Sequence, residues 1–255
     1  MRFFFILILL FPLSLFAQSV QVESNPSWQE NFREENSYKK NWISFGENNQ
    51  LTSTSSEGDI YIKQGKLYIV LDKVFDVHKN PSINLRNSSK HEFKYGKIEV
   101  RAKCPISKGM WPAIWLRPAS GIYPIIAGEV DIMEWISCFN KYSFQPNFHI
   151  WGKFNGKVNN HVQYPKPVRN KFDISKFHVY SAEWDNEKLI VRVDGIEVAN
   201  WYAKDYPVWP FDYGYELVMD VSYGGWGASC GYDLSKLPQA MIVDWIKYYK
   251  LKTIN

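Results

Sequence analysis

Residues 96–103 read Gly96-Lys97-Ile98-Glu99-Val100-Arg101-Ala102-Lys103, so apolar and charged side chains alternate along this segment. A period of two residues predicts a β-strand with one face in the core and the other in solvent. The dipeptides Gln64-Gly65 and Asp194-Gly195 are typical of the tight turns that join such strands. Further strand-like runs lie at residues 66–72, 177–185, 188–193, 215–223 and 241–250.

These runs place the chain in the all-β class. No 12-residue amphipathic helix can be found in the sequence, and only residues 173–176 are typical of a helical turn. Many short strands joined by turns predict two packed sheets, a sandwich or jelly roll. A length of 255 residues suits one domain with a sizeable core. Residues 20–58 are polar and less regular, and we expect them to add loops and an edge strand to that domain.

The first residues differ in character from the rest of the chain. A positive start at Met1-Arg2 precedes an apolar run over residues 3–16, and the small residues Ala17 and Ser19 follow. This layout predicts a secretory signal peptide at residues 1–17, cleaved after Ala17 or Ser19, and it is too short to span a membrane. We therefore expect residues 18–255 to be exported to the periplasm or the medium as a single domain, without membrane insertion.

Composition narrows the class of partner. The net charge is +4 and the basic residues are scattered, so we expect no nucleic-acid partner. Aromatic residues make up 17% of the chain, with 11 tryptophans, and such rings serve both as core mass and as flat platforms for sugars. Three cysteines, Cys104, Cys138 and Cys230, allow one disulfide whose partners the sequence leaves open, and their spacing matches no zinc site.

Three acidic residues lie close together in one otherwise apolar segment. The segment, residues 128–135, reads Gly128-Glu129-Val130-Asp131-Ile132-Met133-Glu134-Trp135. In a regular strand Glu129 and Asp131 share one face, while Glu134 points to the other. One β-bulge between Asp131 and Glu134 would bring all three acids onto one face and keep Val130 in the core. We therefore predict a bulged strand that presents three carboxyl groups together.

Three carboxyl groups on one strand face suit the hydrolysis of glycosides. That reaction needs one carboxylate to attack the anomeric carbon and one carboxylic acid to protonate the leaving oxygen. The charge of Asp131 would keep a proton on one of its two neighbours. The alternative is a solvated edge strand whose acids only maintain solubility. The apolar residues between the acids and the repulsion of like charges on one face disfavour that alternative.

The segment Glu129-x-Asp131-x-x-Glu134 resembles the signature of the family 16 glycoside hydrolases, the laminarinase, agarase and carrageenase group. The resemblance implies a two-sheet, concanavalin A-like jelly roll with a substrate cleft on the concave sheet. It also implies that residues 18–255 form one catalytic domain, a retaining endo-β-glycosidase acting on a polysaccharide. Further blocks resemble the family in the same order along the chain, at residues 95–103, 109–116, 177–184, 193–195, 209–211, 224–226 and 241–249.

The resemblance assigns roles by position in the motif. It implies that Glu129 is the nucleophile, Glu134 the acid/base and Asp131 an assisting acid. His149, within Asn147-Phe148-His149-Ile150-Trp151, matches the family histidine that neighbours the acid/base. Trp151 itself we expect in the core.

Substrate-binding residues follow from the same resemblance. It implies a hydrogen-bond donor at Arg86 and sugar platforms at Trp111, Trp115, Trp135 and Trp226, with a core position as the alternative for each tryptophan. No cofactor is required. Asp244 lies where some members hold a structural calcium ion, an ion that prefers six to eight oxygen ligands.

One departure from the family bears on the substrate. Laminarinase-like members carry Trp-Pro shortly before the signature, whereas this chain has Tyr123-Pro124 in a longer loop, so we expect Tyr123 to contact the sugar. The first expectation is a monomer that hydrolyses β-1,3(4)-glucan. An endo-β-galactosidase acting on agar-like, mucin or keratan-type glycans stays open, as does a non-catalytic carbohydrate-binding sandwich. The sequence does not separate hydrolysis from transglycosylation.

Overall fold

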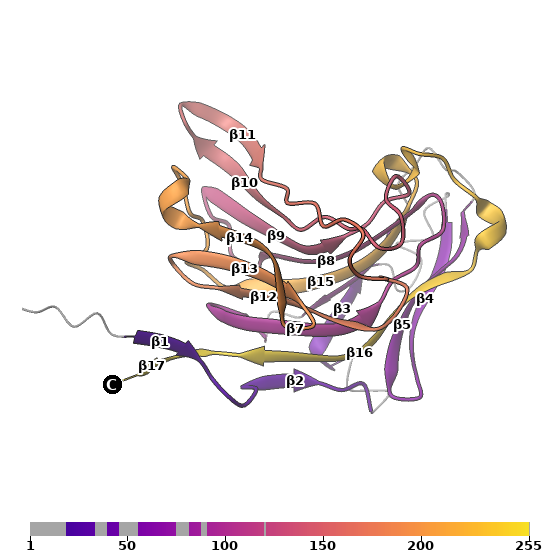
Figure 1. The fold of residues 1–255 in the computed structure, drawn as a ribbon, viewed down its shortest axis with the longest axis horizontal. Helices are drawn as coiled ribbons and strands as arrows, with labels where there is room; N and C mark the ends of the chain where they lie inside the picture. The colour runs from indigo at the N-terminus through magenta and orange to yellow at the C-terminus, as the bar shows by residue number, and fades with distance from the viewer. Residues whose placement is uncertain are drawn as a thin grey trace, which may run out of the picture.

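The computed structural model describes residues 19–33, 40–45, 56–74, 82–87, 91–119 and 121–254. It is a sandwich of two antiparallel sheets (Figure 1). The predicted signal peptide at residues 1–17 lies outside these ranges, so its cleavage stays a prediction. Within the described ranges, no helix combines the length and apolar character that crossing a bilayer requires.

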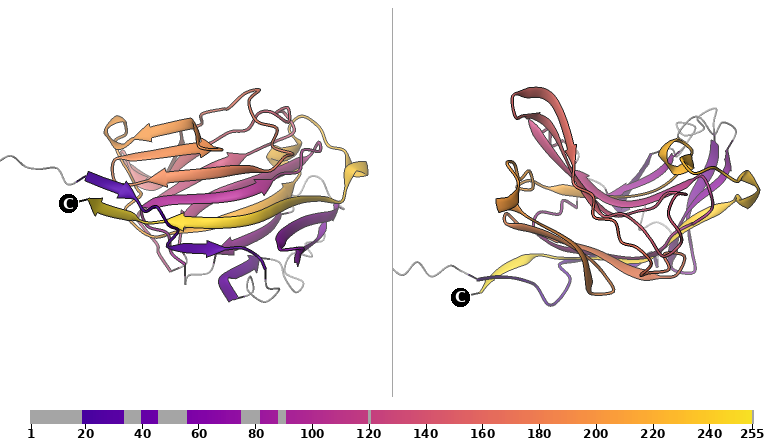
Figure 2. Two further views of the ribbon diagram at one scale, coloured as in Figure 1. Left: turned by 60° about the horizontal axis from the view of Figure 1, so that its bottom comes forward. Right: turned by 45° about the horizontal axis from the view of Figure 1, so that its top comes forward.

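The first sheet has seven strands, and it carries the residues of the acidic motif. Figure 2 shows that this sheet curves, and that its outermost hairpin rises away from the second sheet. In spatial order the strands are β11 (Lys157–Gln163), β10 (Asn147–Phe154), β9 (Ile126–Glu134), β8 (Met110–Pro118), β15 (Tyr215–Tyr223), β6 (Ser82–Asn87) and β3 (Trp42–Phe45).

The second sheet covers the inner face of the first. In this second sheet, the short strand β2 (Trp28–Glu30) pairs with the central strand β16 (Gln239–Tyr249). Outside both sheets, β1 (Ser19–Val22) pairs with β17 (Leu251–Ile254). In spatial order the strands of the second sheet are β14 (Ile196–Tyr202), β13 (Lys188–Val193), β12 (His178–Trp184), β7 (Gly96–Lys103), β16 (Gln239–Tyr249), β5 (Lys66–Val74) and β4 (Ser56–Lys63).

Strand β7 shows how the sequence pattern produces the fold. Its residues alternate strictly between buried and half-buried positions, as the alternation of apolar and charged residues predicts. Strand β15 is instead buried along its whole length, because it is central in its sheet. The predicted all-β class and the two-sheet jelly roll are thus confirmed.

Residues 173–176 form one turn, in which the Lys176 amide donates to the Asp173 carbonyl at 2.8 Å.

Aromatic side chains fill much of the space between the sheets. The largest fully buried side chains include Trp184, Trp201, Tyr180 and Tyr215. Phe148 on β10 contacts Trp201 edge-on, with ring centroids 5.9 Å apart. Much of the high aromatic content therefore serves the core, so only some of the tryptophans remain available to the outer face of the seven-stranded sheet.

Candidate functional site

A β-bulge in strand β9 sets the position of the acidic residues. Met133 pairs with Ile114 and Asp131 pairs with Trp115, so two steps along β9 correspond to one step along β8. Ile132 is the extra residue, and its side chain is fully buried. The bulge restores Glu134 to the face that carries Asp131, as the spacing of the acids predicts.

Glu129, Asp131 and Glu134 consequently share the outer face of the seven-stranded sheet. Asp131 lies opposite Trp115, and Glu134 lies opposite Ala113. The apolar residues between the acids, Val130, Ile132 and Met133, are buried against the second sheet. The apolar side chains thus hold the strand in place while its carboxyl groups face outward.

Glu134 lies at one end of this row of acids. Its Oε1 accepts a hydrogen bond of 2.8 Å from Nε1 of Trp111 on β8. Burial, followed by the charge of Asp131, raises the pKa of Glu134 well above its ordinary value. No positively charged group contributes to this change in the pKa of Glu134. This environment favours the protonated carboxyl group, the form that a general acid needs.

Glu129 lies at the other end, beside positive groups. Burial, with the charge of Asp131, raises the pKa of Glu129 to about 7, while His149 and Arg117 act in the opposite direction. The His149 Nε2 atom lies 3.8 Å from Glu129 Oε1. The two glutamates therefore share a face but differ in their neighbours, which favours ionisation at Glu129 and protonation at Glu134.

His149 lies beside two of the three acids, Glu129 and Asp131. It pairs in register with Glu129, and its Nε2 lies 2.9 Å from Asp131 Oδ2. Burial alone would lower the pKa of His149, but the hydrogen bond and charge of Asp131, together with Glu129, raise it overall. The expectation that His149 neighbours Glu134 was wrong, because the register of β10 on β9 places it opposite Glu129.

The structure adds Asp220 on β15, which the sequence analysis missed. This side chain accepts hydrogen bonds from Trp115 Nε1 at 2.9 Å and from Ser222 Oγ at 2.9 Å. Burial raises its pKa to about 7. Its charge raises the pKa values of both Glu129 and Glu134. The available signal was the period of two in residues 215–223, which places Glu216, Asp220 and Ser222 on one face of a strand that is largely apolar on the other.

The tryptophans predicted to bind sugar differ in their exposure. Trp111 and Trp115 are half-buried on the outer face of β8, where their indole N–H groups bond to Glu134 and Asp220. Trp135 is only 2% exposed and donates its N–H to the Asn140 carbonyl, so the prediction of a sugar platform there was wrong. It follows Glu134 directly, and strand alternation turns it inward.

Tyr123 and Arg86, which were also predicted to contact the sugar, lie outside strands β8 and β9. Tyr123 is 91% exposed, in the loop before β9. The backbone of Arg86 lies on β6 and pairs with Val218 of β15, in line with Asp131 and Trp115 across the sheet. Only the backbone position of Arg86 is described.

One prediction concerned a metal ion, a structural calcium at Asp244. The Asp244 carboxylate pairs with Lys66 at 3.6 Å and with Arg101, and the calcium site there stays a prediction. Within the described ranges, Glu129, Asp131 and His149 offer ligand atoms that all lie within 4.8 Å of one another. Carboxylate and imidazole atoms so placed could hold a divalent cation. Glycoside hydrolysis by two carboxyl groups has no need of one.

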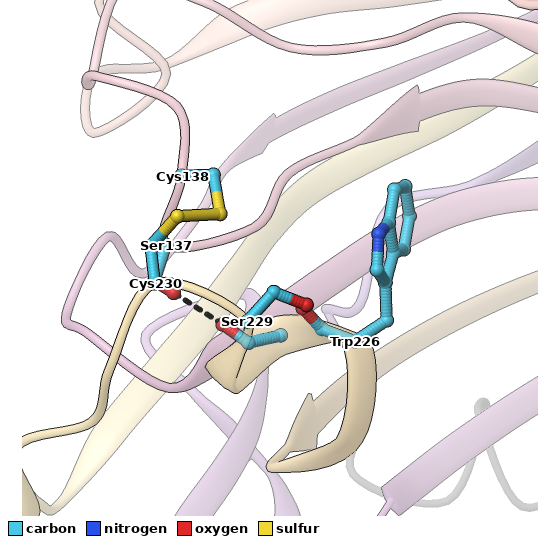
Figure 3. Close-up of a disulfide and its surroundings, with 6 residues drawn as sticks. Ser137, Cys138, Trp226, Ser229 and Cys230 are labelled. Atoms are coloured by element: carbon cyan, nitrogen blue, oxygen red, sulfur yellow. Dashed lines mark hydrogen bonds between the residues drawn. A yellow bond between two sulfur atoms is a disulfide. The ribbon is translucent and has the colours of Figure 1, made fainter.

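A disulfide holds the turn beside the acids in place. Cys138, four residues after Glu134, bonds to Cys230, and Cys104 remains a buried free thiol. Figure 3 shows the disulfide next to the turn η2 (Gly225–Ala228), which carries Trp226. Trp226 is 37% exposed, and its ring meets that of Trp111 edge-on at 5.3 Å.

Replacing both Cys138 and Cys230 by alanine should destabilise the fold. The crosslink closes a loop of 92 residues. Loop-closure entropy then predicts a loss of about 4–5 kcal/mol in the free energy of unfolding, measurable by urea denaturation. The variant Cys104→Ala is the control for loss of a thiol without loss of the crosslink. A double variant as stable as this control would contradict the prediction.

Comparisons with known proteins agree with this geometry. The family model for glycosyl hydrolases family 16 matches residues 47–247. A β-glucanase of Rhodothermus marinus is 32% identical over 184 residues, which cover 66% of this chain and 62% of that protein. Glucan endo-1,3-β-glucosidase A1 of Niallia circulans is 31% identical over 216 residues, covering 77% of this chain and 31% of that protein.

A third relative and a solved structure extend the comparison. Keratan-sulfate endo-1,4-β-galactosidase of Sphingobacterium multivorum is 30% identical over 178 residues, covering 66% of this chain and 39% of that protein. The catalytic domain of an endo-1,3-β-glucanase (laminarinase) from Thermotoga petrophila matches with a TM-score of 0.68 and 26% identity, over 93% of this chain and 100% of that domain. The family model, the relatives and the bulged acidic strand agree, and the chain belongs to the glycosyl hydrolases of family 16.

Proposed function

We propose that this chain is a retaining endo-β-glycosidase that hydrolyses internal linkages of a β-1,3(4)-glucan. The observation that carries the proposal is the unequal environment of two glutamates on one strand face. Glu129 has His149 and Arg117 among the groups that lower its pKa, whereas Glu134 accepts a hydrogen bond from a neutral indole. The proposal includes a monomeric, exported enzyme that needs no cofactor.

The two glutamates would act in two steps. In the first, the Glu129 carboxylate attacks the anomeric carbon and forms a glycosyl ester. The glycosidic C–O bond breaks, and Glu134 gives its proton to the departing oxygen. In the second step, Glu134 takes a proton from water, which attacks the same carbon and releases Glu129 as a carboxylate. Two displacements at one carbon retain its configuration.

His149 would support the first step through charge. Its pKa is raised by Asp131, so the protonated ring favours the ionised form of the neighbouring Glu129. Asp131 in turn raises the pKa of both glutamates through its own charge. The pair of Asp131 and His149 would thus set the pH range in which one glutamate is ionised while the other is protonated.

Replacing Asp131 by Asn should shift the pH profile of hydrolysis toward lower pH. The negative charge of Asp131 raises the pKa values of Glu129 and Glu134, so its removal lowers both, and both limbs of the profile move in the acid direction. We expect kcat/KM to fall by roughly tenfold to a hundredfold, less than in either glutamate variant. A profile unchanged in position, measured from about pH 4 to 9, would remove Asp131 from the mechanism.

A second substrate class has its own support. Tyr123 stands where laminarinase-like members carry a tryptophan, and one relative is named as a keratan-sulfate endo-1,4-β-galactosidase. An endo-β-galactosidase would use the same two glutamates, since the sugar identity is set by the surrounding contacts.

Sizing of products distinguishes these candidates. The protein is incubated with laminarin, lichenan, agarose, carrageenan, keratan and mucin glycans, with Glu129→Gln as the inactive control. A ladder of oligosaccharides from laminarin and lichenan, with the β-anomer formed first in NMR spectra, is the expected result. A ladder from keratan or agarose alone would favour the galactosidase. Binding without shortening of any polymer would favour the carbohydrate-binding sandwich.

A further inference from the structure

The outermost hairpin of the seven-stranded sheet carries an aromatic pair that the proposed mechanism does not use. Trp151 on β10 pairs in register with His161 on β11, and on its other side with Ala127 on β9. Trp151 was expected in the core, but it is 41% exposed. It shares the outer face with His149, two residues before it on the same strand.

His161 covers one face of the Trp151 indole. The two rings are parallel within 3°, with centroids 3.4 Å apart. Parallel rings at this separation overlap fully, so the normal of the indole plane runs from β10 toward β11. The opposite face of the indole must then point back toward β9. Its neighbour there is Ala127, whose methyl side chain leaves space above the sheet.

Hydrogen bonding holds the pair in a fixed orientation. His161 Nε2 lies 2.8 Å from His149 Nδ1, and His149 bonds to Asp131 through its other ring nitrogen. The platform is therefore connected to the acidic row before any ligand binds. A preformed aromatic face loses little conformational entropy on binding.

The open face of Trp151 lies within one sugar ring of the acids. Ala127 and Glu129 are two residues apart on the same face of β9, about 7 Å along the strand. Trp111 and Trp115 lie on β8, on the other side of β9. Trp115 is opposite Asp131, and Trp151 is opposite Ala127, so Trp115, Glu129 and Trp151 lie on a diagonal across the sheet. A chain of sugars along this diagonal would reach the space above Ala127 after it passes Glu129.

We propose that Trp151, supported by His161, is a binding platform for a pyranose ring of the polysaccharide, next to the bond that is cut. The inference rests on the proposed function and deepens it, since it extends the substrate path across β9 onto the β10–β11 hairpin. The exposed indole face stacks on the apolar C–H face of the sugar. The indole contributes to substrate binding and takes no part in proton transfer.

The test is the variant Trp151→Ala, with Val158→Ala as its control. Val158 is 68% exposed on the same hairpin and lies outside the stacked pair. For laminarin, we expect KM to rise by roughly fivefold or more in Trp151→Ala, with kcat and its pH profile unchanged within about twofold. Trp151→Phe should recover part of the loss, because it keeps a ring. Val158→Ala should match the wild type.

Binding without turnover provides the second measurement. Isothermal titration calorimetry with laminarihexaose compares Glu129→Gln with the double variant Glu129→Gln/Trp151→Ala, and Kd should rise by the same factor as KM. If the Trp151→Ala substitution leaves KM and Kd unchanged while the wild type shortens laminarin, the binding platform is overturned and the proposed function stands. A fall in kcat with a shifted pH profile would also overturn it, because Trp151 would then act through His161 and His149. A wild type that fails to shorten laminarin would overturn the proposed function and the platform with it.

Discussion

Replacing Glu129 by Gln should reduce laminarin hydrolysis by at least about four orders of magnitude, because the amide cannot form the glycosyl ester. The substitution keeps the shape of the side chain and removes a partly buried carboxyl group, so the fold should persist. The measurement is the initial rate of release of reducing ends, together with the free energy of unfolding in urea. This is the largest effect that we expect from a single substitution.

The matched control for this variant is Glu187→Gln. Glu187 is an exposed acid in the turn between β12 and β13, on the other sheet. It should retain full activity. Substantial hydrolysis by Glu129→Gln in a correctly folded protein would show that another group attacks the anomeric carbon.

Replacing Glu134 by Gln should lower hydrolysis of the polysaccharide by roughly a hundredfold to ten-thousandfold, the usual contribution of a general acid–base. A sugar leaving group needs the proton that Glu134 supplies. A dinitrophenyl glycoside does not, because its leaving group departs as a stable anion, so formation of the glycosyl ester from it should be nearly unaffected. The two substrates together identify the role of Glu134.

Azide provides the complementary readout for Glu134→Gln. Breakdown of the glycosyl ester by water needs a base, whereas azide attacks without one. Added azide should therefore accelerate turnover of the aryl glycoside in this variant and give a glycosyl azide with retained configuration. Equal losses on both substrates, without acceleration by azide, would exclude Glu134 as the acid/base.

The spacing of the acids was enough to predict the central feature of the site. Glu129, Asp131 and Glu134 can share a face only if the strand contains an extra residue, and the apolar character of Ile132 indicates where its side chain goes. The strict alternation at residues 96–103 similarly identifies a half-buried strand. These are local properties, and local patterns can be read from one sequence.

Features that depend on pairing between distant strands could not be read in this way. The register of β10 on β9 places His149 opposite Glu129, and no local pattern specifies that register. The bond between Trp115 and Asp220 joins residues 105 positions apart. The disulfide between Cys138 and Cys230 likewise depends on which loops meet at one end of the sheets.

Exposure of tryptophans was the least predictable property. Trp135 lies in the core, whereas Trp151 lies on the surface. The alternation of side chains along a strand explains both positions. Trp135 is one residue from the outward-facing Glu134 and therefore points inward, whereas Trp151 is two residues from the outward-facing His149 and therefore points outward. Applying that rule required the bulge and the strand register, which the structure supplies.

Trapping of the glycosyl ester tests the central claim most directly. A 2-deoxy-2-fluoro glycoside with a dinitrophenyl leaving group forms the ester but breaks down slowly, because fluorine destabilises the second transition state. Digestion and mass spectrometry then locate the attached sugar. We expect the sugar to be attached to Glu129. A sugar attached to Glu134 or Asp131 would contradict the assignment of the nucleophile, and rapid turnover to an inverted product would contradict the retaining mechanism.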